Sequence, residues 1–377
     1  MQQQPFLWSD PATHLVRATP DHAVLYFSPA QLHATANTFQ SGFDGLVTYA
    51  VKANDSSVVL DNLVAAGITT FDVASPAEMH SVRQVFEKAV LHYNNPVRSE
   101  AEIAHAVALG VESWSVDDAG ELDKLSVVPR SAEIAVRFAL PVAGAAYDFG
   151  SKFGATPVQA VRLLKRVVAM GFEPSLCFHP GTQCEDPQVW ATYINAAAQI
   201  VATSGVTIKR LNIGGGFAAH RAGAAPDLKA VFEVISNTVA HAFGATTPTL
   251  ICEPGRAMVA ESFALSTRVK GLRGSNTVFL NDGIYGGLAD LRDMTLPDRL
   301  SVISPAGEHR SAPARARVVF GPTCDSLDRI PDGLRLPMDT AVGDYVVFDA
   351  MGAYSLAMST AFNGYGLREV ICVQSLC

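Results

Sequence analysis

Lys52 ends an apolar run in Tyr49-Ala-Val-Lys52-Ala-Asn54, where its chemistry depends on its surroundings. A lysine amine that is taken out of water between apolar walls becomes a nucleophile toward aldehydes. His179 follows another apolar run, in Phe178-His179-Pro-Gly-Thr182, and an imidazole there can lie flat on a planar ring or titrate. Taken alone, each residue is more often ordinary: a surface lysine, or a histidine held by hydrogen bonds.

An acid, an arginine and a glycine turn add a second kind of chemistry. Glu253 and Arg256 stand in Cys252-Glu253-Pro-Gly255-Arg256, and the turn Gly214-Gly215-Gly216 presents backbone N–H groups that can hold a phosphate. An acid can pair with a pyridinium nitrogen while a lysine binds an aldehyde. Lys52, Glu253 and Arg256 together with the glycines therefore indicate pyridoxal 5'-phosphate.

The same segments permit two weaker interpretations. The stretch from Gly214 to Ala219 matches the dinucleotide pattern G-x-G-x-x-A, with Glu233 near the expected distance, but no clear helix follows it. Cys177, His179 and Cys184 suggest zinc, yet no fourth ligand has suitable spacing. We therefore expect neither a nicotinamide dehydrogenase nor a metal site.

Two further clusters occur in the last third of the sequence. Gly321-Pro-Thr-Cys324-Asp325-Ser-Leu-Asp328 holds a thiol and two carboxylates, and Asp349-Ala-Met-Gly352-Ala-Tyr354 places a phenol after a glycine. Both segments have the residues of ordinary turns. Their chemistry is therefore left open by composition alone.

The scaffold that positions these residues is an ordinary globular chain. It has 377 residues, 49% hydrophobic and 17% charged, which excludes disorder, collagen and coiled coil and suggests roughly two domains. The net charge of −8 provides no basic field for nucleic acid or an anionic membrane. Residues 1–15 lack the basic flank and apolar stretch of a secretory signal, and the sequence has no run of ~18 apolar residues and no C-x-x-C pair. We expect a cytoplasmic protein with reduced thiols.

Short β-branched runs alternate with helical segments between residues 46 and 252. The eight runs are 46–51, 68–73, 89–93, 113–116, 133–140, 174–178, 207–213 and 249–252, and the helical segments include 76–88, 100–109, 156–170, 187–203 and 227–243. Eight such repeats predict a closed (β/α)8 barrel, with an open doubly wound sheet as the alternative. In a barrel, chemistry collects where the strands end, and Lys52, His179 and Glu253 fall there.

After residue 261 the pattern changes to strands without helices. The runs 263–272, 276–281, 315–321, 344–350 and 367–373 predict a mostly antiparallel β-sandwich or barrel, and residues 23–27 could pair with it. We therefore predict a barrel domain over 27–266 and a β domain made of 1–26 and 267–377.

Over nearly its whole length the chain resembles the fold-type III pyridoxal-phosphate decarboxylases of the ornithine/diaminopimelate group, of which alanine racemase is a distant relative. The segments that carry the resemblance are 49–54, FDVAS (71–75), SKFG (151–154), FHPGT, NIGGGF, CEPGR, NDGIYG (281–286), FGPTCDSLDRI (320–330) and MGAYSLAMSTAFNGY. The CDSLD and AFNGY segments resemble ornithine decarboxylases more than diaminopimelate decarboxylases.

This resemblance implies a role for each residue of the cofactor site. Lys52 would bind the cofactor aldehyde, His179 would stack on its ring and Glu253 would pair with the ring nitrogen. Asp72 and Arg137 would order the ring's surroundings. The implied phosphate site consists of Thr182, where the family usually has serine, together with Gly214, Gly215, Gly216, Gly255, Arg256 and Tyr354.

The resemblance also implies a substrate site shared between two subunits of a head-to-tail homodimer. Cys324 would protonate the carbanion after carbon dioxide leaves, and Asp325 would take the distal ammonium of the substrate, both acting on the partner's barrel. Asp293 resembles a second acid for this ammonium, and Tyr285 would also bind substrate. Lys152 and Asp328 resemble a salt bridge across the dimer interface.

The expected reaction is decarboxylation of a basic L-amino acid, with L-ornithine to putrescine first and L-lysine to cadaverine second. One methylene changes binding by only about 1 to 3 kcal/mol, so the sequence leaves both open. Alternatives are a related or conjugated diamino acid (diaminopimelate, D-ornithine, D-lysine or a siderophore intermediate), a racemase on the same barrel, and a non-catalytic PLP-binding regulator. Loss of Lys52, Cys324 or Asp325 would favour the regulator, and all three are present.

Overall fold

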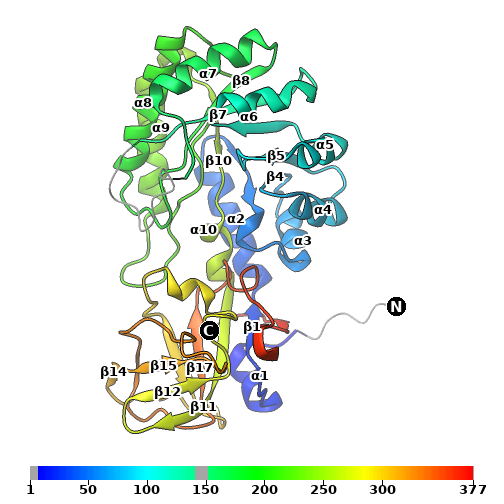
Figure 1. Ribbon diagram of the computed structural model, residues 1–377. Helices are drawn as coiled ribbons and strands as arrows, with labels where there is room; N and C mark the ends of the chain where they lie inside the picture. Colours follow the sequence, from blue (N-terminus) through cyan, green and yellow to red (C-terminus); the bar gives the residue numbers. More distant parts are fainter. Residues whose placement is uncertain (1–6, 141–151, 377) are drawn as a thin grey trace. The chain divides into compact units, whose positions relative to one another are not determined.

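The computed structural model describes residues 7–140 and 152–376, and its contacts divide the chain into two units (Figure 1). The barrel unit comprises residues 36–218 and 226–257, and the β unit comprises 1–35, 219–225 and 258–377. The predicted domains divided the chain at 26/27 and 266/267 instead. The β unit thus also includes residues 27–35 and 258–266, which were predicted to belong to the barrel, and the short segment 219–225.

The barrel unit contains a sheet of nine parallel strands. In chain order these are β2 (Leu46–Val47), β3 (Tyr49–Ala50), β4 (Thr70–Val73), β5 (Val90–Tyr93), β6 (Ser113–Val116), β7 (Glu133–Arg137), β8 (Glu173–Cys177), β9 (Arg210–Asn212) and β10 (Thr249–Cys252). The pairing order is β2-β10-β9-β8-β7-β6-β5-β4-β3. Because β2 and β3 are separated only by Thr48, the two ends of this order meet, which confirms the predicted barrel.

The first predicted run is divided because its two halves pair with different strands. β2 pairs with β10 and β3 pairs with β4. Thr48, between them, donates its N–H and its hydroxyl to the carbonyl of Cys252 at 2.9 and 3.1 Å. The nine strands therefore correspond to the eight predicted runs, because the first run is divided into β2 and β3.

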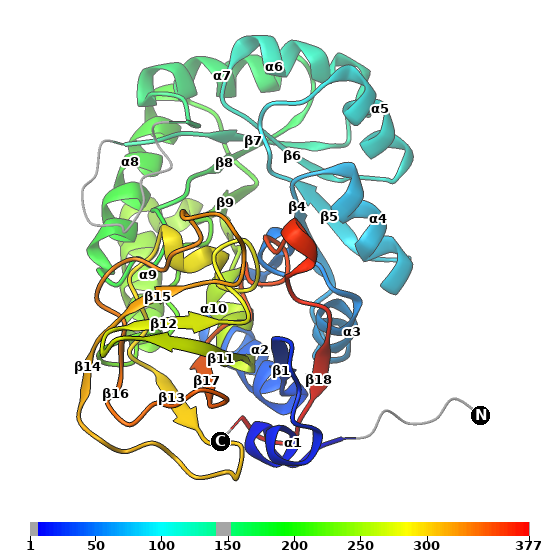
Figure 2. The same ribbon diagram turned by 60° about the horizontal axis from the view of Figure 1, so that its bottom comes forward.

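Helices cover the outside of this sheet, as Figure 2 shows for α4 to α8. They are α3 (Ser57–Ala65), α4 (Pro76–Val85), α5 (Glu100–Ala108), α6 (Ala119–Lys124), α7 (Pro157–Ala169), α8 (Gln188–Ser204) and α9 (Leu228–Phe243). Ser99 and Thr156 form capping boxes at the starts of α5 and α7, which accounts for these predicted starts. In the described part of the chain, no helix has both the length and the apolar character that crossing a membrane requires.

The β unit is built around the long strand β11 (Phe263–Arg273). It pairs antiparallel with β1 (Val24–Phe27), β12 (Thr277–Leu280) and β17 (Tyr345–Asp349). β13 (Leu300–Ile303) pairs antiparallel with β17, β15 (Val318–Phe320) runs parallel to β12, and β18 (Val370–Cys372) runs parallel to β1. β14 (Ala314–Ala316) and β16 (Arg335–Pro337) form a separate antiparallel pair. The mostly antiparallel domain is thus confirmed, as is the pairing of residues 23–27 with it.

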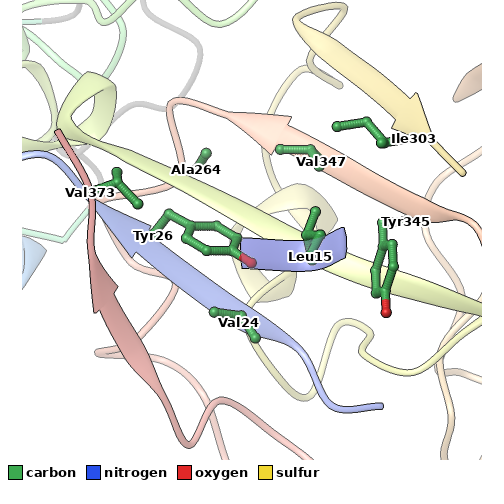
Figure 3. Close-up of a cluster of buried hydrophobic side chains, with 8 residues drawn as sticks. All are labelled: Leu15, Val24, Tyr26, Ala264, Ile303, Tyr345, Val347 and Val373. Atoms are coloured by element: carbon green, nitrogen blue, oxygen red, sulfur yellow. The ribbon is translucent and has the colours of Figure 1, made fainter. Parts of the chain in front are cut away.

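Buried side chains from both ends of the sequence form one core of the β unit (Figure 3). Leu15 comes from α1 (Pro11–Ala18), and the remaining members are Val24, Tyr26, Ala264, Ile303, Tyr345, Val347 and Val373. The two phenol groups are satisfied: the Tyr26 hydroxyl lies 2.8 Å from His14 Nδ1, and that of Tyr345 donates to Pro20 O at 3.2 Å. The core thus joins the N-terminal helix to strands far along the chain.

Candidate active site

The predicted cofactor residues of the barrel unit lie at or just after the C-terminal ends of its strands. Asp72 is the last but one residue of β4, Arg137 ends β7, and His179 follows β8. The sequence analysis places Lys52 at the end of a strand, but β3 ends at Ala50. Lys52 stands beyond it in a 3-10 turn (Val51–Ala53), with its side chain exposed. This turn is held by the Tyr49 hydroxyl, which donates to Asn54 O at 2.8 Å.

The charges at this end of the barrel interact with one another. Burial raises the pKa of the Asp72 carboxyl, and the cations Lys52 and Arg137 oppose this rise. Burial and the neighbouring Asp72 raise the pKa of Glu253 to about 8, again opposed by Lys52 and Arg137. The structure therefore brings two acids and two cations, which come from four separate strands, into one electrostatic cluster.

Two asparagines that the sequence analysis did not assign contact Glu253. Asn94, directly after β5, donates from Nδ2 to Glu253 Oε1 at 2.5 Å. Asn212, the last residue of β9, donates from Nδ2 to the same oxygen. Each asparagine stands at the end of a parallel strand, and this position was the only signal by which the sequence could have indicated them.

His179 and the glycine turn form one wall of the site. Burial, followed by the cations Lys52 and Arg137, holds the pKa of His179 well below its usual value, so its imidazole is neutral. Its Nδ1 accepts from Gly181 N at 3.1 Å, which requires the proton to be on Nε2 in the neutral ring. Its planar ring can stack on an aromatic cofactor.

The glycine turn permits a close approach of backbone strands that a side chain would block. Gly214 has φ +69°, and a Cβ there would lie 2.3 Å from Phe178 O. A Cβ at Gly215 would lie 2.5 Å from Glu253 O and 3.4 Å from His179 Nε2. The missing side chains therefore let the turn pack closely against His179 and the segment of Glu253, and a glycine turn of this kind can hold a phosphate through its backbone. No helix opens after the turn, since α9 begins at Leu228, which argues against the dinucleotide interpretation.

Several predicted residues belong to the β unit. Tyr285 donates its hydroxyl to Asp325 Oδ2 at 2.7 Å, and Leu327 N donates to Asp325 Oδ1 at 2.9 Å. These two bonds hold the pKa of the Asp325 carboxyl below its usual value. Cys324 is exposed, and its N–H and thiol both donate to Asn363 Oδ1, at 3.3 and 3.4 Å. Cys324 and Asp325 line one hollow of about 380 Å³.

The other predicted residues of this unit have partners within their own chain. Asp293 is exposed and accepts from its neighbour Arg292 at 2.8 Å. Asp328 is only 1% exposed and accepts from Ile284 N and from the N–H and hydroxyl of Thr323. Tyr354 has φ +62°, a strained conformation for a bulky side chain that is typical of functional positions.

The cysteine and histidine set that suggested zinc does not form a ligand cluster. Cys184 Sγ donates to Asp186 O at 3.6 Å, and Cys177 Sγ to Ala135 O at 3.8 Å. Within residues 7–140 and 152–376, no three histidine, cysteine or acidic side chains gather as metal ligands would.

A lysine on the rim of a parallel barrel, with a neutral histidine and a shielded acid facing a glycine turn, defines a class of barrel enzymes that bind an aldehyde cofactor. The family profile described as "Pyridoxal-dependent decarboxylase, pyridoxal binding domain" matches residues 29–260. The chain therefore belongs to the pyridoxal-dependent decarboxylases, and its cofactor is pyridoxal phosphate.

Similar proteins cover most of the chain. Mouse ornithine decarboxylase is 31% identical over 355 residues, which is 87% of this chain and 75% of that protein. Antizyme inhibitor 2 of Xenopus laevis is 30% identical over 343 residues, 84% of this chain and 73% of that protein. The crystal structure of a lysine/ornithine decarboxylase from Vibrio vulnificus, complexed with putrescine, covers 96% of both chains with a TM-score of 0.81 at 25% identity.

Replacing Gly214 by alanine should weaken PLP binding roughly tenfold, about 1.4 kcal/mol, because the new Cβ would collide with Phe178 O and move the turn. The measurement is a titration of the apoprotein with PLP, followed by visible absorbance. Gly205→Ala is the matched control: Gly205 has nearly the same φ, +68°, but open space around its missing Cβ. Equal losses in both variants would show that backbone strain alone is responsible.

Proposed function

We propose that this protein decarboxylates a basic L-amino acid, with L-ornithine as the first candidate and L-lysine as the second. The observation that carries this proposal is the environment of Asp325. Tyr285 and Leu327 hold its carboxylate from both oxygens and lower its pKa, so that it is ionised at neutral pH beside the Cys324 thiol. A fixed carboxylate of this kind favours a substrate whose side chain ends in an ammonium.

The residues at the barrel end fit the cofactor that the family uses. When bound, pyridoxal phosphate supplies an aldehyde that reacts with amines and a ring that accepts the electrons of the bond that breaks. Lys52 would provide the amine that holds the aldehyde, His179 would lie against the ring as a neutral imidazole, and Glu253 would pair with the ring nitrogen. The phosphate is assigned to Thr182, Gly214, Gly215, Gly216, Gly255, Arg256 and Tyr354.

Asp72 and Arg137 are assigned to the surroundings of the ring. Asp72 is 8% exposed and lies within electrostatic reach of both Lys52 and Arg137. The two cations therefore offset the accumulation of negative charge at Asp72 and Glu253. This balance keeps two acids in one enclosed space.

The substrate side of the reaction is assigned to Cys324 and Asp325. The thiol of Cys324 supplies a proton to the carbon that loses carbon dioxide, and Asp325 binds the distal ammonium, with Asp293 and Tyr285 beside it. We propose that both act on the barrel of a partner subunit, in a head-to-tail homodimer. The contact of the thiol with Asn363 Oδ1 supports this role, because it orients the proton donor before substrate arrives.

The proposed interface bridge would pair Lys152 with Asp328 of the other subunit. Lys152 is exposed and lies 4.9 Å from the ring of Phe153, so it is available to a partner. Asp328, however, is buried and accepts three hydrogen bonds from its own chain. Its carboxylate therefore serves first to hold the loop that carries Cys324 and Asp325.

The second candidate function is a PLP-binding regulator without activity, and the relative named antizyme inhibitor 2 is the reason to test it. Lys52, Cys324 and Asp325, whose loss would favour this role, are all present. Related substrates such as diaminopimelate, D-ornithine, D-lysine or a siderophore intermediate are further outcomes of the same assay.

Carbon dioxide release should be fastest with L-ornithine or L-lysine among a panel that also contains D-ornithine, D-lysine, L-arginine and meso-diaminopimelate. Lys52→Ala should abolish this release and the borohydride-trapped PLP adduct. Lys209→Ala, at a position before β9, should retain both. A chain that binds PLP but releases no carbon dioxide from any substrate would be the regulator instead.

Asp325→Asn should raise the KM for L-ornithine and L-lysine roughly tenfold or more, because a charge-assisted contact with the ammonium is lost. Asp332→Asn serves as the control, since Asp332 is an exposed acid of the same unit that pairs with Arg329. The measurement is steady-state kinetics with each amino acid. An unchanged KM in Asp325→Asn would remove the ammonium contact from the proposal.

Cys324→Ala should divert turnover from the amine product toward an aldehyde, because the proton normally given to the substrate carbon goes to the cofactor carbon instead. Part of the cofactor is then recovered as pyridoxamine phosphate, which chromatography detects. Cys372→Ala, at a partly buried cysteine of β18, should behave as the parent. Formation of the normal amine alone by Cys324→Ala would contradict the assigned role.

A further inference from the structure

Two asparagine amides meet at one oxygen of Glu253. Asn94 Nδ2 and Asn212 Nδ2 both donate to Oε1, although they come from the ends of β5 and β9, which three strands separate in the strand order. The other oxygen, Oε2, accepts no hydrogen bond from the described residues. The two oxygens of this carboxylate are thus used differently.

The orientation of the Asn212 amide is fixed by the backbone. Its Oδ1 accepts the N–H of Gly214 at 2.9 Å, so its Nδ2 has to point the other way, toward Glu253. Glu253 is itself attached to this turn, because its N–H donates to Gly214 O at 2.9 Å. Asn212 therefore joins the glycine turn and the acid in one unit.

The amide of Asn94 lies between two acids. Besides its bond to Glu253, its side chain hydrogen-bonds to Asp72 and thereby lowers the pKa of that carboxyl. Its backbone N–H donates to Val73 O at 3.2 Å, which ties it to the strand that carries Asp72. An NH2 group that serves both carboxylates allows them to share an enclosed space.

We propose that Asn94 and Asn212 are positioning residues that hold Oε1 of Glu253, leave Oε2 to face the ring nitrogen of PLP, and keep the shared proton on that nitrogen. The inference rests on the proposed pairing of Glu253 with the ring nitrogen, and it adds how this pairing is tuned. A carboxylate that accepts two N–H bonds binds a proton less tightly, so the proton stays on the ring.

The reason such tuning is needed lies in the surroundings of Glu253. Burial and the charge of Asp72 both favour the protonated acid, and the Asn212 bond, Lys52 and Arg137 oppose them. The titratable and charged groups that act on Glu253 or lie against its segment are Lys52, Asp72, Arg137, Cys177, His179 and Cys252. Without the amide donors, the acid would compete with the ring nitrogen for the proton that makes the ring an electron acceptor.

The test uses the PLP-loaded protein with ¹⁵N in the cofactor ring, whose chemical shift reports whether the ring nitrogen is protonated. Asn212→Asp keeps an oxygen for Gly214 N but removes the N–H donor, and Asn94→Leu removes the other donor. In both variants the protonated fraction should fall at neutral pH, and the PLP dissociation constant should rise about tenfold. The pH at which the shared proton is lost should rise by about one unit.

Asn95→Ala is the matched control, since Asn95 is the neighbouring asparagine and donates to Ala74 O at 3.3 Å, not to Glu253. If Asn94→Leu fails to fold, Asn94→Ala replaces it. Both donor variants could keep the chemical shift and the pH midpoint of the parent protein while Glu253→Gln changes them. That result would overturn this inference and leave the pairing of Glu253 with the ring nitrogen intact. If Glu253→Gln also leaves the ring nitrogen unchanged, the pairing fails and this inference fails with it.

Discussion

The site depends on how the barrel closes. Its first strand is divided at Thr48, so that β2 pairs with β10 on one side and β3 pairs with β4 on the other. Ala50 N donates to Pro254 O at 3.2 Å, which continues this contact beyond the strands. Because the segment before Lys52 lies against the segment of Glu253, the amine and the acid become neighbours although about two hundred residues separate them in sequence.

Enclosure at this end of the barrel has an electrostatic cost that the chain offsets locally. Burial alone would neutralise Asp72 and Glu253, and the two cations and the asparagine amides act against it. Burial, followed by the same cations, lowers the pKa of His179 and keeps its imidazole neutral. One arrangement of charge therefore accounts for an acid that can pair with a ring nitrogen and a histidine that can lie flat on a ring.

Sequence periodicity located the elements well because the parallel strands are short apolar runs between capped helices. All eight predicted runs contain barrel strands, whereas β13 and β16 of the β unit were missed, since they lie among turns and not between capped helices. The contact of Asn94 with Glu253 could not be predicted, because it joins two strand ends far apart in the sequence and leaves no local pattern. The burial of Asp328 was hidden for a similar reason: it depends on the fold of its own loop.

The pairing of β1 has a consequence for the chain while it is being synthesised. This strand precedes the barrel strands in the chain, whereas its partners β11 and β18 follow them. Its four residues are buried in the finished protein, so they remain an exposed apolar edge while translation proceeds. The nascent chain thus carries a segment suited to recognition by chaperones, and the pairing of β1 is complete only after β18 has been made.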